Sequence, residues 1–174
     1  MDLGISRRRF AGLLGAAATL YSVRRAVAAA LPEPQGKTIL TVSGKISVVN
    51  KDNTAQFDRD MLESLGMVGF STTTPWYNGQ VKFEGVPMDR LMKAVGATGD
   101  HVTALALNDY STDIPVEDFT KYNVILALKR DGTYMPVRDK GPLFIVYPFD
   151  SNTELQQHKY YARAAWQVAK MVVK

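Results

Sequence analysis

The sequence predicts an α+β fold, in which mixed β-sheets are accompanied by a few short helices. Runs of β-branched and aromatic residues recur along the chain and outnumber the segments with helical periodicity. An Asp-Gly pair, Asp131-Gly132, stands between two apolar runs, which is a strong signal for a β-hairpin. The length of 174 residues favours a single domain, and we expect it to cover residues 31–174.

The predicted strands have alternating or continuous apolar character and are bounded by turn residues. They cover residues 38–48, 67–74, 80–84, 101–107, 111–114, 124–129, 134–137 and 143–147. Turns are expected at 50–53 and 75–79, where Asn, Asp, Pro and Gly gather.

Three short helices are predicted between these strands. The first covers residues 58–65, with Asp58 as its N-cap and Gly66 at its end. Pro87 begins the second, which runs to about residue 95. Pro115 is expected at the first position of the third, a brief helix that ends at residue 119.

The positive charge of the chain lies in its N-terminal segment. Residues 1–30 hold five arginines and one acid, whereas the remaining 144 residues hold 16 basic and 16 acidic side chains. A body without net charge gives no reason to expect nucleic acid as a partner, since phosphate binding needs clustered Lys and Arg.

The same N-terminal segment has the three parts of a secretory signal. Ser6-Arg7-Arg8-Arg9-Phe10 precedes a weak apolar core, and small residues follow at 26–30. The paired arginines resemble a twin-arginine signal. We therefore expect a signal peptide at 1–30, cleavage near residues 28–30, a periplasmic protein, and the twin-arginine export machinery as a partner. Contact with a membrane is expected only through this segment. The alternatives are an uncleaved anchor and a cytosolic amphipathic helix.

Three polar clusters stand at the ends of predicted strands, where loops commonly build binding sites. Ser71–Thr74 is followed by Trp76 and Tyr77, Asn108-Asp109-Tyr110 follows a buried strand, and Arg138–Pro142 precedes one. Each cluster is also compatible with a purely structural role. The two histidines are far apart in sequence, and the absence of cysteine excludes a thiol nucleophile and a Cys-ligated metal.

Several ordered motifs resemble the sulfite-oxidase-like family of molybdopterin-binding domains. Residues 83–92, Phe-Glu-Gly-Val-Pro-Met-Asp-Arg-Leu-Met, are similar to its W-x-G-V-P-L-x-x-L-L stretch. Residues 114–118 and 140–148 are similar to its L-P-L-E-D and G-G-P-L-R-L-V-V-P motifs, and residues 163–167 resemble the R-x-x-W-Q of small exported members. The match spans about residues 38–172. It implies the sulfite-oxidase-like molybdopterin-binding fold.

The chain departs from that family at the metal ligand. Enzymes of the family ligate molybdenum through a cysteine upstream of the G-V-P stretch, and this chain has none. Counting back from Gly85 places the missing ligand near Thr73, whose hydroxyl is neither soft nor anionic. The resemblance therefore leaves the cofactor open, with molybdopterin as the candidate and no protein ligand for the metal. The residues expected to bind the cofactor or ligand are Thr72, Thr73, Thr74, Trp76, Asn108, Asp109, Tyr110, Arg138, Lys140 and Arg163.

Two functions follow from this departure. In the favoured one, the old pocket binds a small molecule or anion, or a periplasmic protein partner, as a binding or sensory module. Arg138, Lys140 and Arg163 would supply its positive charge. In the alternative, the protein is an oxidoreductase that holds a molybdopterin through polar loops without a thiolate. A third hypothesis is an interaction protein that uses Trp76 and Tyr77.

Overall fold

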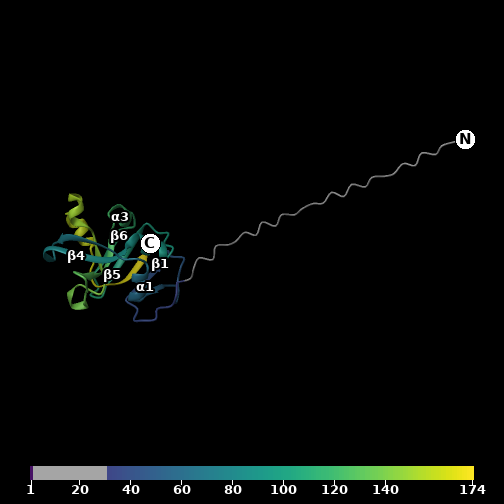
Figure 1. Ribbon diagram of the computed structural model, residues 1–174, viewed down its shortest axis with the longest axis horizontal. Coiled ribbons are helices and arrows are strands. Elements are labelled where there is room, and N and C mark those ends of the chain that lie inside the picture. The colour runs from purple at the N-terminus through teal and green to yellow at the C-terminus, as the bar shows by residue number, and fades with distance from the viewer. Residues whose placement is uncertain (2–30) are drawn as a thin grey trace.

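Within residues 31–174, two sheets of five strands each form the framework of the fold (Figure 1). The computed structural model describes Met1 and residues 31–174, so the predicted signal peptide and its cleavage site lie outside the described residues. Short helices join the strands, and the predicted α+β class is confirmed.

The first sheet has the strand order β2-β1-β10-β5-β6 and is mixed. β1 and β10 run parallel, with Thr41 opposite Lys170, whereas the other neighbours are antiparallel. Figure 1 accordingly shows the C-terminus beside β1. In the order of the sheet, the strands are β2 (Ala55–Phe57), β1 (Leu40–Gly44), β10 (Val168–Val173), β5 (His101–Ala106) and β6 (Ser111–Pro115).

The second sheet has the order β3-β4-β7-β8, and β9 also pairs with β7. All of its pairs are antiparallel. The predicted hairpin at Asp131-Gly132 is confirmed, with φ of 47° and 78° at the two turn residues. The strands are β3 (Val68–Thr74), β4 (Tyr77–Pro87), β7 (Ile125–Arg130), β8 (Thr133–Tyr134) and β9 (Phe144–Val146).

The predicted turn at 75–79 is wrong in its extent, because β4 already begins at Tyr77. Thr74 lies opposite Tyr77 and Thr73 opposite Gln80, so Asn78-Gly79 forms a bulge inside the strand. Asn78-Gly79, which the sequence assigned to the turn, therefore lies within β4. The tight turn between β3 and β4 consists of Pro75-Trp76 alone.

The helices are all short. α1 (Arg59–Ser64) begins as predicted, with the Asp58 carboxylate accepting the Met61 N–H at 2.9 Å. α2 (Met88–Ala94) follows Pro87 and buries one face. Within residues 31–174, no helix has the length and apolar content to cross a membrane.

The third helix begins later than predicted. Pro115 is the last residue of β6, opposite His101, and α3 covers Glu117–Lys121. Its proline therefore ends an edge strand, where a missing N–H is tolerated, instead of beginning a helix. The last helix, α4 (His158–Arg163), was not predicted. Three 3₁₀ turns complete the described elements, at Val137–Asp139, Phe149–Ser151 and Thr153–Leu155.

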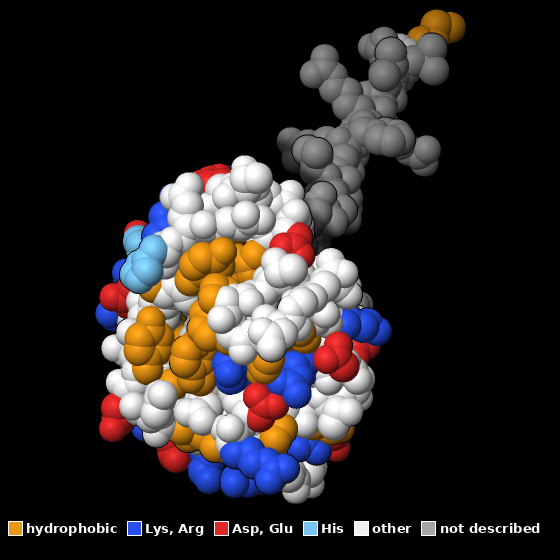
Figure 2. Space-filling view, turned by 90° about the vertical axis from the view of Figure 1, so that its left-hand side faces the viewer, with side chains coloured by type: hydrophobic (Ala, Val, Ile, Leu, Met, Phe, Trp, Pro, Cys, Tyr) orange, Lys and Arg blue, Asp and Glu red, His pale blue; other side chains and the backbone are white. Residues whose placement is uncertain are grey.

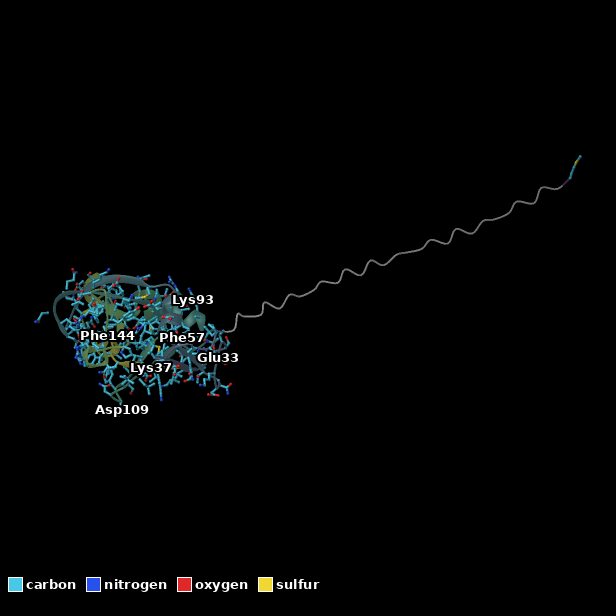
Figure 3. The ribbon with its side chains drawn as sticks, turned by 60° about the horizontal axis from the view of Figure 1, so that its bottom comes forward. Glu33, Lys37, Phe57, Lys93, Asp109 and Phe144 are labelled. Atoms are coloured by element: carbon cyan, nitrogen blue, oxygen red, sulfur yellow. The ribbon has the colours of Figure 1, made fainter. Side chains whose placement is uncertain are left out.

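Both sheets contribute to a single hydrophobic core. Phe57 of the first sheet and Phe144 of the second are fully buried, and Figure 3 shows them in different parts of the body. Gly85 lets β4 approach β7 closely, since a Cβ there would lie 2.1 Å from the Leu126 carbonyl oxygen. The glycine of the G-V-P motif is therefore a packing requirement of the second sheet.

Candidate functional site

A cavity of about 470 Å³, hereafter the aromatic cavity, opens at the end of the body that carries the β3–β4 turn. Figure 2 faces this end and shows hydrophobic side chains gathered near its middle, with charged side chains beside them. Half of the lining residues are Trp or Tyr, and among the described residues the lining contains no carboxylate, Lys or Arg. It consists of Trp76, Asn108, Tyr110, His158, Tyr161, Ala162, Ala164 and Trp166.

Separate segments bring these aromatic rings together. Trp76 comes from the β3–β4 turn, Tyr161 from α4, and Trp166 from the segment before β10. The ring centroid of Trp76 lies 5.3 Å from that of Trp166 and 6.2 Å from that of Tyr161, with interplanar angles of 72° and 86°. These edge-to-face contacts are the favourable geometry for aromatic pairs, so the walls of the cavity stabilise one another.

The turn between β5 and β6 supplies the polar part of the cavity. The Asn108 side-chain oxygen accepts the Tyr110 N–H at 3.3 Å, and the Tyr110 hydroxyl donates to the Ala162 carbonyl at 2.7 Å. The turn is thereby tied to α4. Within residues 31–174, the amide nitrogen of Asn108 has no hydrogen-bond acceptor, so it can donate to a ligand.

Asp109, expected at the same site, lines a different hollow. Its backbone is left-handed, with φ of 64°. Its neighbours in that hollow include Leu105, Ser111 and Lys170. The structure therefore separates Asp109 from Asn108 and Tyr110, although the three are consecutive in the sequence.

The threonine cluster is held by Asp150. The backbone N–H of Thr73 donates to the Asp150 carboxylate at 2.7 Å, and the Thr73 hydroxyl donates to its other oxygen. The Asp150 N–H donates to the buried Thr72 hydroxyl at 3.1 Å. The hydrogen bond from the Thr73 hydroxyl is the main cause that lowers the pKa of Asp150. The Thr74 hydroxyl accepts the Trp76 N–H at 3.3 Å.

Thr73, which the resemblance places near the metal-ligand position, thus forms a hydrogen bond with the Asp150 carboxylate of the same chain. Sequence reasoning missed Asp150, and no local signal could have found it, because it lies 77 residues from Thr73.

Arg163 is already paired. Its Nη1 lies 2.7 Å from the Asp118 carboxylate, which is only 4% exposed and also accepts the Tyr147 hydroxyl at 2.8 Å. Burial and the Asp118 charge together raise the pKa of Tyr147. The charge of Arg163 therefore compensates a buried carboxylate and holds α4 against the core.

Of the two remaining predicted cations, only Lys140 is in contact with a residue of the cavity. The Lys140 ammonium is 4.7 Å from the ring centroid of Tyr77 and 5.5 Å from that of Trp166. Arg138 is exposed and forms no ion pair in the part of the chain that the structure describes. Arg130 was not among the predicted cations. It pairs with Asp139 at 2.7 Å and lies over the Tyr77 ring, which Lys140 also approaches.

Comparison with known proteins identifies the family. The model of the oxidoreductase molybdopterin binding domain matches residues 48–151, more than half of the chain. The chain belongs to this family. The molybdopterin-binding domain is also similar in fold to the sulfane dehydrogenase SoxCD from Paracoccus pantotrophus, with a TM-score of 0.59 and 15% sequence identity. That match covers 77% of this chain but only 37% of the other. No curated protein matches the sequence.

The donors present in this molybdopterin-binding domain do not fit a molybdenum centre held by the protein. The sequence has no thiolate to offer, and the described residues contain no group of three His, Asp or Glu side chains arranged to hold a metal. Among the described residues, the lining of the aromatic cavity includes no Lys or Arg, and Lys140 lies beside it, 5.5 Å from the Trp166 ring centroid.

Proposed function

We propose that this domain is an exported small-molecule-binding module of sensory or ligand-carrying type, and that the aromatic cavity is its ligand site. The observation that carries this proposal is the cavity itself, in which Trp76 meets Tyr161 and Trp166 from the C-terminal part of the chain, beside the Asn108 amide. Its volume of about 470 Å³ lies within the ordinary range of ligand sites, roughly 300–1,000 Å³.

The hydrogen bonds at Thr73 support a ligand-binding role over a molybdopterin-dependent oxidoreductase. Two donors of Thr73 are directed to Asp150, and Arg163 is directed to Asp118. Thr73 and Arg163, which were expected to bind the cofactor, therefore already form interactions within the protein.

The lining indicates the character of the ligand. Trp76, Tyr161 and Trp166 offer aromatic faces and edges, which favour a planar or apolar body. The Asn108 amide offers a hydrogen bond, and Lys140 near Trp166 supports a ligand with an anionic group at its edge.

The two tryptophans provide a direct test. Trp76 and Trp166 are the only tryptophans of the chain, and both line the aromatic cavity. A ligand that enters the cavity should therefore change the intrinsic tryptophan fluorescence in a saturable manner. A panel of neutral and anionic aromatic compounds, titrated against the purified protein, would reveal such a ligand.

A pair of neighbouring variants makes the test specific. Asn108→Ala removes the free amide and should weaken binding about tenfold, as expected for one lost hydrogen bond in a ligand site. Asp109→Asn, on the same turn but in the other hollow, should bind as the wild type does. Equal effects of the two variants would argue against the cavity as the site.

Metal and pterin analysis tests whether the protein holds a molybdopterin cofactor. The protein should be isolated from its native host after synthesis with its own N-terminal segment, and the periplasmic fraction should contain it. We expect well-folded protein without molybdenum. One equivalent of molybdenum with a fluorescent pterin would instead support an oxidoreductase that holds its cofactor without a thiolate, the function that family membership favours.

A further inference from the structure

A second hollowed region of the protein lies over β10, next to β1 and the β5–β6 turn. Two hollows of about 250 and 340 Å³ adjoin there and share Leu107, Ala169 and Lys170. We call the two together the β10 groove. Figure 3 shows Lys37 of one hollow and Asp109 of the other on the same side of the body.

The groove results from a bulge in β10. The register of β10 against β5 shifts between Val168 and Lys170, which leaves Ala169 without a partner. Its small side chain lines both hollows. Leu107 from the β5–β6 turn and Ile39 from the segment before β1 form the sides.

Apolar side chains stand exposed in this groove. Leu107 is 54% exposed and Val137 is 51% exposed, and both line the hollow that also contains Ile39 and Pro142. Single exposed apolar residues are common on proteins, but two of them around one hollow support a binding surface there.

The charge of the groove is positive at one end. Lys37 and Lys170 both line the first hollow, which contains no carboxylate. Neither lysine forms an ion pair within residues 31–174. The single carboxylate, Asp109, lies in the adjoining hollow. An occupant of the first hollow therefore meets apolar side chains and two ammonium groups that form no ion pair within residues 31–174.

We infer that the β10 groove binds a small anionic amphiphile, a straight-chain carboxylate whose alkyl chain lies over Ala169, Leu107 and Ile39. Its carboxylate pairs with Lys37 or Lys170. This site is distinct from the aromatic cavity, because the two hollows and the cavity have no lining residue in common.

The test is a titration of the protein with hexanoate, octanoate and decanoate, followed by backbone amide NMR and calorimetry. Saturable shifts are expected at Leu107, Ala169 and Lys170. Each pair of added methylenes should tighten binding by roughly tenfold or more, about fourfold per methylene, until the groove is filled. The indole signals of Trp76 and Trp166 should not move. A failure here is therefore distinguishable from a failure of the proposed function, which those indoles report.

Variants separate the two parts of the contact. The double variant Lys37→Gln, Lys170→Gln should weaken octanoate roughly two- to fivefold and leave 1-octanol unchanged, whereas Leu107→Asn should weaken both. Lys93→Gln, an exposed lysine on α2, is the control and should change neither.

Three results would overturn the inference. They are an absence of saturable shifts in the groove, equal affinities of octanoate and octanol, and a concentration-dependent dimer that Leu107→Asn dissociates. The last result would assign the groove to a second copy of the chain.

Discussion

Thr73 stands near the position that the family resemblance assigns to the metal ligand. Its hydroxyl donates a hydrogen bond to the Asp150 carboxylate. The carboxylate also receives the Thr73 N–H, so the backbone of β3 is connected to the 3₁₀ turn at Phe149–Ser151.

Thr73→Val keeps the shape of the side chain and removes its hydroxyl. The pKa of Asp150 should then rise toward the ordinary value of about 3.9, because the hydrogen bond that lowers it most is lost. NMR titration of the Asp150 carboxyl carbon measures this pKa. Thr73→Ser keeps the hydroxyl and should leave the pKa low.

The same pair sets a pH dependence. A carboxylate whose pKa is depressed in the folded state stabilises the fold above the unfolded pKa, and this contribution is lost as the pH falls through the folded pKa. Thr73→Val should therefore reduce the free energy of unfolding at pH 7, by about 1 kcal/mol or less, and have little effect at about pH 2. An unchanged Asp150 pKa in this variant would contradict the assignment.

Among the elements, those with local signals were predictable. Asp58 accepts the Met61 N–H as an N-cap should, and Asp131-Gly132 forms the expected hairpin turn. α4 carries no such signal, since no side chain caps its first turn. It is formed by tertiary contacts, of which the Arg163–Asp118 pair is one. Pro115 does not begin the predicted helix, because it pairs with His101 as the last residue of the edge strand β6.

The ion pair between Arg163 of α4 and Asp118 of α3 gives a testable prediction. Arg163→Met should lower the free energy of unfolding by about 3 kcal/mol, because it leaves the buried Asp118 carboxylate without its cation. Urea denaturation measures this change. Adding Asp118→Asn should recover part of the loss, since the buried charge is then removed while the Tyr147 hydroxyl keeps an acceptor.

A second cation on the same helix serves as the control. Lys159 lies 3.7 Å from Glu154, and both side chains are exposed. Lys159→Met should therefore change the stability by less than about 1 kcal/mol. If Arg163→Met were equally mild, Arg163 would be free to serve a ligand after all.

At the scale of the whole molecule, the two sheets share one core and should unfold together. Both tryptophans lie near the aromatic cavity, whereas the strands of both sheets determine the far-UV circular dichroism. The two signals should give coincident urea transitions. A fluorescence transition at lower urea than the dichroism transition would show that the cavity end unfolds separately.

The candidate site was predictable only in part. The resemblance pointed to Trp76, Asn108 and Tyr110, which the structure brings to one cavity. Tyr161 was not among the expected residues, because its place depends on α4 and on how that helix packs. Arg163 was expected as a free charge, but its partner Asp118 lies 45 residues away, and sequence spacing does not reveal that pairing.

The middle position of β10 in the first sheet has a consequence for biosynthesis. This strand is the last of the described strands to leave the ribosome, yet it joins β1 to β5. Until then, β1–β2 and β5–β6 exist only as separate hairpins, and isolated hairpins are marginally stable in water. The core of this sheet therefore assembles after translation of almost the whole domain, and the nascent chain exposes its apolar strands until that moment.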